Sequence, residues 1–116
     1  MGGADYGDGV DVVHLDLEPL DGAPGVAMGV LWPGTDPELV RVDVAVLAPG
    51  ASLPRHPAGR EQGFYVVSGE GRVAGDDDVE VAVGQGSLVT WSAGEQHTSW
   101  ADTTMTVVIV QRRPAG

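Results

Sequence analysis

The chain has 116 residues, a length that suits one domain and is too short for two. It carries 17 acidic and 6 basic residues, a net charge of −11, so nucleic acid and anionic membranes are unsuitable partners. It has no cysteine, which excludes disulfides, thiolate metal sites and cysteine nucleophiles. No apolar run approaches the roughly 20 residues that span a bilayer, and the first residues do not resemble a signal peptide, so a cytoplasmic protein is expected.

Short β-branched runs alternate along the chain with turns rich in glycine and proline, which number 18 and 8. No window keeps an apolar period of about 3.6 residues, so little or no helix is expected. This pattern is typical of a β-sandwich or barrel.

The first three predicted strands cover residues 10–17, 26–32 and 39–47, after a loose tail at residues 1–9. Val13 and Leu15 share one face of the first strand, and Val26 and Met28 share one face of the second. The third alternates most clearly, with valines at 40, 42, 44 and 46 on one face and Arg41 and Asp43 on the other. We expect the valine-rich sides of such strands to face the core.

Six further strands are predicted at residues 64–67, 72–74, 79–83, 88–91, 97–100 and 105–111, and residues 112–116 form a second loose tail. The aspartates at 76–78 read as a solvated hairpin tip in preference to a cation site. Short turns without intervening helices exclude a βαβ sheet. The sequence therefore predicts one all-β, double-sheet jelly-roll domain over residues 10–111, with a pocket at its wider end.

The three histidines are the main candidates for chemistry. His14 lies on the polar face of the first predicted strand, so a surface position is expected. His56 and His97 each stand where a separate strand begins, and the two could converge in space. Spacing alone supports this weakly, because unrelated pairs of histidines are common.

Two stretches of the chain resemble the two motifs of the cupin family. The first motif has a glycine, five residues, His-x-His, three residues, a glutamate, six residues and a glycine. The chain keeps this spacing with Gly50, His56, Ala58, Gln62 and Gly69. The resemblance implies a cupin barrel, also known as a double-stranded β-helix.

The second motif has a glycine, five residues, Pro-x-Gly, two residues, a histidine, three residues and an asparagine. The chain keeps this spacing too, with Gly86, Gly94, His97 and Ala101. The residues around both motifs are also similar to a subgroup of very small bacterial cupins with an incomplete metal motif. The two motifs in this order strengthen the expectation of a cupin fold.

In cupins, the two histidines and the glutamate of the first motif hold a divalent metal with the histidine of the second. His56 and His97 match, whereas Ala58 replaces a ligand histidine and Gln62 replaces the glutamate. Glu61 is one residue out of register and should face away from the site. The resemblance implies a metal site of His56, Gln62 and His97 for Zn, Ni, Fe, Cu or Mn, without the usual carboxylate.

Five further residues are expected around the pocket. Phe64 and Val66 share the face of Gln62 if their strand alternates regularly, and Ala58 stands at a ligand position. Trp91 and Trp100 flank the second motif, where each could stack on a ligand or simply pack in the core or a dimer interface.

The leading hypothesis is a small-molecule cupin that uses a divalent metal for Lewis-acid or O₂ chemistry. His56 or His97 could instead act as a general base in a metal-free isomerase or lyase. The alternatives are a ligand-binding or sensing module without metal or chemistry, and a structural domain with a vestigial pocket. Whether the protein is an enzyme stays open, and the resemblance implies a homodimer whose N-terminal strands could pair across subunits.

Overall fold

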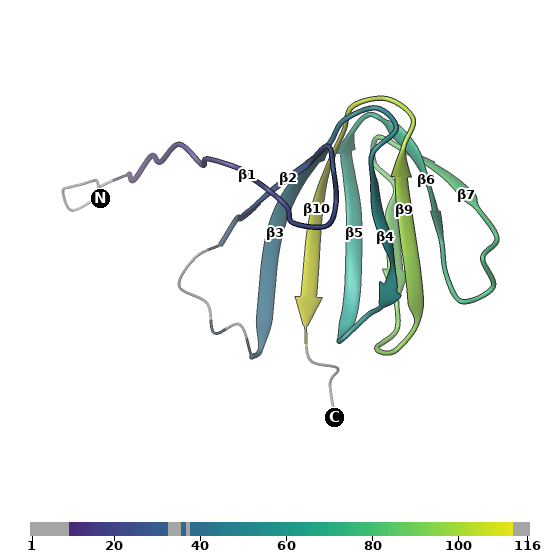
Figure 1. Cartoon of the computed structure of the whole chain (residues 1–116). Coiled ribbons are helices and arrows are strands. Elements are labelled where there is room, and N and C mark those ends of the chain that lie inside the picture. Colours follow the sequence, from purple (N-terminus) through teal and green to yellow (C-terminus); the bar gives the residue numbers. More distant parts are fainter. Residues whose placement is uncertain (1–9, 33–35, 37, 113–116) are drawn as a thin grey trace.

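The computed structural model describes residues 10–32, 36 and 38–112 and shows two antiparallel sheets that face each other (Figure 1). No helix occurs in that part of the chain. The predicted all-β jelly roll is therefore confirmed. The tail predicted at residues 1–9 lies outside the described residues, as does the tail predicted at 112–116 apart from Arg112, which belongs to the last strand.

The larger sheet has six strands and the smaller has four. Across the larger sheet the order is β1 (Glu18–Pro19), β2 (Val26–Val30), β3 (Val40–Leu47), β10 (Met105–Arg112), β5 (Glu61–Ser68) and β8 (Leu88–Trp91). Across the smaller sheet it is β4 (Ser52–Pro57), β9 (Gln96–Ala101), β6 (Glu70–Ala74) and β7 (Val81–Gly84). The last strand, β10, thus lies between β3 and β5 and joins the N-terminal strands to those of the first motif.

The strand predicted at residues 10–17 is wrong. This segment is extended but pairs with no strand of the described chain, and it projects away from the sheets in Figure 1. Only β1 pairs, with Glu18 opposite Met28. Leu15 and Leu17 lie against Gly29 of β2, whereas Val10 and Val12 are largely exposed. Residues 10–17 do alternate between apolar and polar side chains. A strand also needs a neighbouring strand to pair with, and the chain reaches β2 only at Glu18.

The faces of β3 are the reverse of those predicted. Asp43, Ala45 and Leu47 are buried between the sheets, and Arg41 lies on the same face, while the valines at 40, 42, 44 and 46 face outward and are partly buried. Alternation tells which residues share a face but not which face is inside. Four β-branched residues made the outer face of this strand look like the core.

The core lies between the sheets and is built mainly from β3, β5 and β10. Its largest fully buried apolar side chains are those of Phe64, Leu47, Met105, Val66 and Val107. The turn after β5 passes close to the backbone before β10. Gly69 in this turn has φ +89°, and a Cβ there would collide with the backbone oxygen of Thr104. Only glycine fits such a close approach.

No helix long and apolar enough to cross a membrane occurs among the described residues.

Candidate functional site

His56 and His97 meet inside the barrel, as their motif positions implied. Strands β4 and β9 pair with His56 opposite His97, after an irregularity in β4 between Leu53 and His56. The Nε2 atoms of the two imidazoles are 2.9 Å apart, and the ring centroids are 4.2 Å apart. His97 is only 4% exposed, whereas His56 is more open. The pair therefore joins one buried and one accessible imidazole.

The hydrogen bonds around the pair assign its protons. The Nδ1 atom of His56 is 2.7 Å from the carbonyl oxygen of Pro54, which can only accept, so His56 carries its hydrogen on Nδ1. The Nε2 atom of neutral His56 is then an acceptor, and His97 donates to it from Nε2. The remaining nitrogen of His97, Nδ1, accepts from the amide of Gln62 over a long 3.4 Å. A single direction of donation thus runs from Gln62 through both rings.

His97 is poised to stay neutral. Burial of its ring penalises the imidazolium form, and the nearby charge of His56 adds to the effect, so the pKa of His97 falls to about 4. At neutral pH the ring can therefore donate from Nε2 and accept at Nδ1 but bears no charge.

Gln62 and Glu61 take the two orientations expected from their order along β5. Gln62 is buried and faces His97, while Glu61 turns outward and pairs with Arg112 at 2.6 Å. Gln62 contacts the Nδ1 side of His97, away from the Nε2 atoms that face each other. Its contact orients the ring of His97.

A cavity of about 270 Å³ lies beside the histidine pair, between the two sheets. Its apolar lining includes Leu20, Met28, Leu53, Phe64, Trp91 and Ile109. Its polar lining includes Arg41, Asp43, His56, Gln62, His97, Thr98, Ser99 and Gln111. The cavity is therefore apolar over much of its surface, with polar groups from both sheets.

The five residues expected around the pocket occupy different places. Phe64 and Trp91 line the cavity, and Trp91 contacts both Phe64 and His97 edge to face. Val66 is part of the core, and Ala58 is buried with its N–H donating to the Glu95 carbonyl. Trp100 lies on the other face of β9, under the guanidinium of Arg72 at 5.2 Å.

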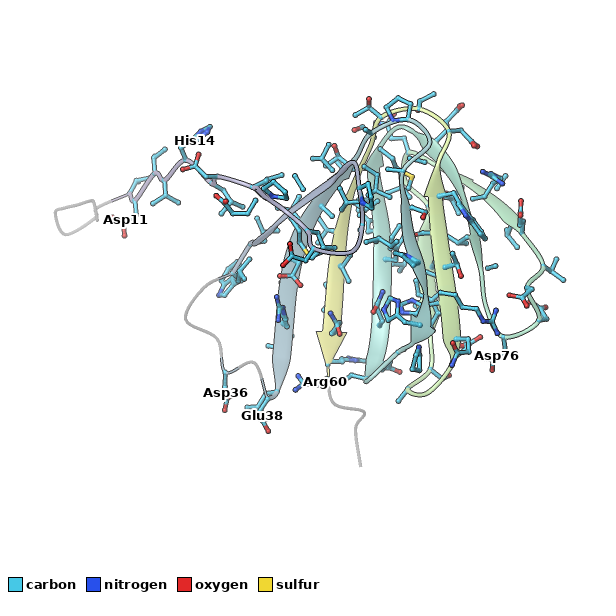
Figure 2. All side chains as sticks on the ribbon, in the orientation of Figure 1. Asp11, His14, Asp36, Glu38, Arg60 and Asp76 are labelled. Carbon is cyan, nitrogen blue, oxygen red and sulfur yellow. The ribbon has the colours of Figure 1, made fainter. Side chains whose placement is uncertain are left out.

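Two features weighed in the sequence lie away from this cavity. His14 is on the projecting N-terminal segment and is almost fully exposed, as expected, while Asp76 is at the opposite end of the molecule (Figure 2). Asp76 accepts from the Gln96 N–H at 2.7 Å, and Asp77 accepts from the Val79 N–H at 3.0 Å. Asp76 thus holds the start of β9, and Asp77 holds a backbone group of its own turn.

Sequence reasoning missed Arg41, Asp43 and Gln111, which share the inner face of the larger sheet. Asp43 is 2% exposed, and its Oδ2 atom accepts from the Nε atom of Arg41 at 2.9 Å. The available signal was an acid and a base two residues apart in a strand, since such residues share a face. Asp43 is buried and Arg41 is about half exposed, but both were assigned to the surface because the valines were assigned to the core.

The donor set permits a metal but lacks its usual anion. No group of three or more His, Asp or Glu side chains able to hold an ion occurs in the described part of the chain. Two nitrogens each about 2.1 Å from one ion are about 3 Å apart when they bind at a right angle, which matches the Nε2 atoms here. The separation of the two Nε2 atoms is therefore compatible with a shared divalent ion, but neither a carboxylate nor Gln62 lies on the same side.

Solved structures with the same fold come from several kinds of protein. The polyketide cyclase RemF from Streptomyces resistomycificus superposes with a TM-score of 0.77 at 22% identity, covering 90% of this chain and 80% of its own. An RmlC-like cupin from Shewanella frigidimarina superposes with a TM-score of 0.75 at 19% identity, covering 95% of this chain and 89% of its own. A predicted oxalate decarboxylase from Thermotoga maritima superposes with a TM-score of 0.74 at 20% identity, covering 86% of this chain and 92% of its own. At such identities the likeness shows the fold alone.

No curated protein matches this sequence. The family model described as a cupin domain matches residues 43–111, which span β5 to β10 together with β4 and most of β3. That stretch holds both motifs and all three residues implied as ligands. The chain therefore belongs to the cupin family.

Proposed function

We propose that this cupin binds a small organic metabolite in the barrel cavity, with His56 and His97 as its polar centre. The observation that carries the proposal is a cavity of about 270 Å³ beside a hydrogen-bonded histidine pair, of which His97 is buried and His56 accessible. Ligand pockets usually measure about 300–1,000 Å³ and combine apolar walls with a few polar groups, so this one suits a small ligand.

The proton arrangement of the histidine pair favours a hydroxyl group between the rings. His97 presents an N–H at Nε2, and His56 presents a lone pair at Nε2. A ligand hydroxyl that separates the two rings replaces their direct hydrogen bond, because it accepts from His97 and donates to His56. In this position His56 is also the group that would receive a proton, should the bound ligand react.

Filling the cavity tests ligand binding. Leu53 lines the cavity and the adjacent Ser52 does not, so Leu53→Trp and Ser52→Trp form a matched pair on β4. We expect metabolites that raise the melting temperature of the wild type to lose this effect in Leu53→Trp and keep it in Ser52→Trp, measured by thermal shift. Equal responses in both variants would place the bound ligand elsewhere.

A divalent metal between the same two nitrogens is the second candidate, favoured by the 2.9 Å separation of the Nε2 atoms. His56 already has its Nε2 lone pair available, whereas His97 must move its hydrogen to Nδ1. Gln62 must then turn its amide so that the oxygen accepts from Nδ1. Such an ion, Zn, Ni, Fe, Cu or Mn, would polarise a carbonyl or hydroxyl of the ligand, or activate O₂ if it is iron.

Calorimetric titration with Zn²⁺ separates this candidate from adventitious binding. We expect His97→Ala to weaken binding by at least about ten-fold, and Gln62→Glu to strengthen it because a carboxylate accepts better from Nδ1–H. His14→Ala is the control for surface histidines. Imidazole ¹⁵N spectra should also show the hydrogen of His97 moving to Nδ1 on binding. An affinity that is the same in His56→Ala and His97→Ala as in the wild type would exclude the metal site.

A further inference from the structure

We propose that Arg41 and Asp43 form a recognition subsite in the barrel cavity, where Asp43 accepts a hydrogen bond from a hydroxyl group of a neutral small molecule. This inference rests on the proposed ligand-binding function and specifies the chemistry of the ligand. It concerns the wall of the cavity formed by the larger sheet, across from the histidine pair on the smaller sheet.

The register of the larger sheet sets polar residues side by side on its inner face. Gln111 on β10 lies opposite Arg41 on β3 and opposite Gln62 on β5. In the adjoining row, Asp43 lies opposite Ile109. Directly opposed side chains on one face stand about 5 Å apart, so the polar row reaches from Arg41 to the residue that contacts His97. One small ligand can therefore touch both ends.

The carboxylate of Asp43 is only half satisfied. Its Oδ2 atom accepts from Arg41 Nε at 2.9 Å, but Oδ1 is buried and has no hydrogen-bond partner among the described residues. The side chain is 3% exposed and lines the cavity. A buried acceptor without a donor costs free energy, and most such atoms in folded proteins are paired. Because Oδ1 belongs to a cavity wall, a donor on a bound ligand can supply the missing bond.

The charge balance of the wall favours a neutral donor. Arg41 and Asp43 carry the guanidinium and the carboxylate of the lining, and they already compensate each other. An ammonium ligand would bring a positive charge beside Arg41, and a carboxylate ligand would bring a negative charge beside Asp43. Beside the buried carboxylate of Asp43, either ion would lose hydration without gaining a new partner of opposite charge, which is costly. A hydroxyl donates without adding a charge.

The remaining walls require an apolar body on the same ligand. Met28, Phe64 and Ile109 line the cavity on the same sheet as Asp43. The expected ligand class is therefore a small neutral alcohol with a hydrocarbon portion. A ligand with two hydroxyls would reach both Asp43 and the histidine pair.

Four probes with one ring test this chemistry: cyclohexanol, methoxycyclohexane, cyclohexylammonium and cyclohexanecarboxylate. Each is titrated into the ¹⁵N-labelled full chain, and dissociation constants are taken from amide shifts of the cavity strands. In the wild type we expect cyclohexanol to bind about ten-fold more tightly than its methyl ether, and more tightly than either ion. In Asp43→Asn the new amide N–H can donate to the oxygen of the alcohol and equally to the oxygen of the ether. The dissociation constants of the two probes should therefore lie within about two-fold of each other.

Asp102→Asn is the matched control, because Asp102 also accepts from an arginine Nε, that of Arg72 at 3.2 Å, but is exposed. It should keep the wild-type preference. Should Asp43→Asn fail to fold, the double variant Arg41→Met, Asp43→Leu replaces the whole pair by apolar side chains, a change that folded proteins often tolerate. It too should lose the preference.

The outcomes separate this inference from the proposed function. The subsite is overturned if the probes shift only cavity residues but the alcohol binds no more tightly than the ether. It is also overturned if the preference for the alcohol survives in Asp43→Asn. Either result leaves ligand binding in the cavity intact. Tighter binding of the ammonium or the carboxylate also overturns it. The absence of shifts at the cavity with all four probes overturns the subsite and counts against the ligand-binding function.

Discussion

The single proton that links His97 to His56 makes the centre of the site sensitive to pH. The neutral form of the His97 imidazole is favoured because the ring is buried and faces a second imidazole, which lowers the pKa of His97 to about 4. In the unfolded chain a histidine titrates near pH 6.5. Between these two values, the unfolded state binds more protons than the folded state.

The stability of the metal-free protein should therefore fall as the pH drops from about 6.5 to about 4, and be unaffected by this group at higher pH. For His97 the loss is at most about 3 kcal/mol, and less where water reaches the ring. Chemical denaturation at several pH values checks this. His97→Gln should flatten the dependence in that window, whereas His14→Gln, on the exposed N-terminal segment, should leave it unchanged. Identical slopes for His97→Gln and the wild type would contradict the assignment.

The resemblance to the two motifs predicted part of the arrangement around the cavity. His56 and His97 could be placed together because the motif spacing fixes which strands carry them, and β4 and β9 do pair at these residues. The role of Gln62 needed geometry, since only the structure shows that it contacts Nδ1 of His97. Asp43 and its partner Arg41 were missed because an aspartate is rarely buried, and burial depends on which face of a strand the opposite sheet covers.

At the level of elements, four strands of the motif region were the most predictable, whereas β4 was not among the predicted strands and carries His56 near its end, not at its start. Strands β5, β8, β9 and β10 begin and end within a few residues of the predicted bounds, because turns with glycine delimit them. The N-terminal strands were less predictable. In residues 10–17 the alternation has no neighbouring strand to pair with among the residues that the structure describes, and in β3 it indicated the wrong inner face. Pairing and orientation are long-range properties that a local pattern does not contain.

The outward valines of β3 raise a question about the whole molecule. Val44 lies opposite Val108 of β10, and Val67 and Leu88 extend the same outer face over β5 and β8, where they are exposed. A continuous apolar sheet face of this kind is usually covered by a partner. The net charge of −11 makes copies of the chain repel each other, but the outward residues of β3 at 40, 42, 44 and 46 are all uncharged valines.

We therefore expect a homodimer that pairs these faces about a two-fold axis. Light scattering after gel filtration should give twice the 11.9 kDa of one chain. Val44→Lys places a charge in the centre of the face and should give a monomer. Val79→Lys, an exposed valine between β6 and β7, should remain dimeric. A wild type that elutes as one chain at micromolar concentration would rule out this arrangement.

The tight turn at Gly69 has a consequence for how sequences of this kind are classified. Gly69 and Gly86, the glycines that close the first motif and open the second, both have φ +89°, and at Gly69 the chain also passes against Thr104. Neither glycine touches the histidine pair, so selection on the turns can preserve the spacing of both motifs after the ligands have changed. The spacing therefore identifies the barrel, and a search for metal-dependent members of the family has to read the side chains at positions 56, 58, 62 and 97 themselves.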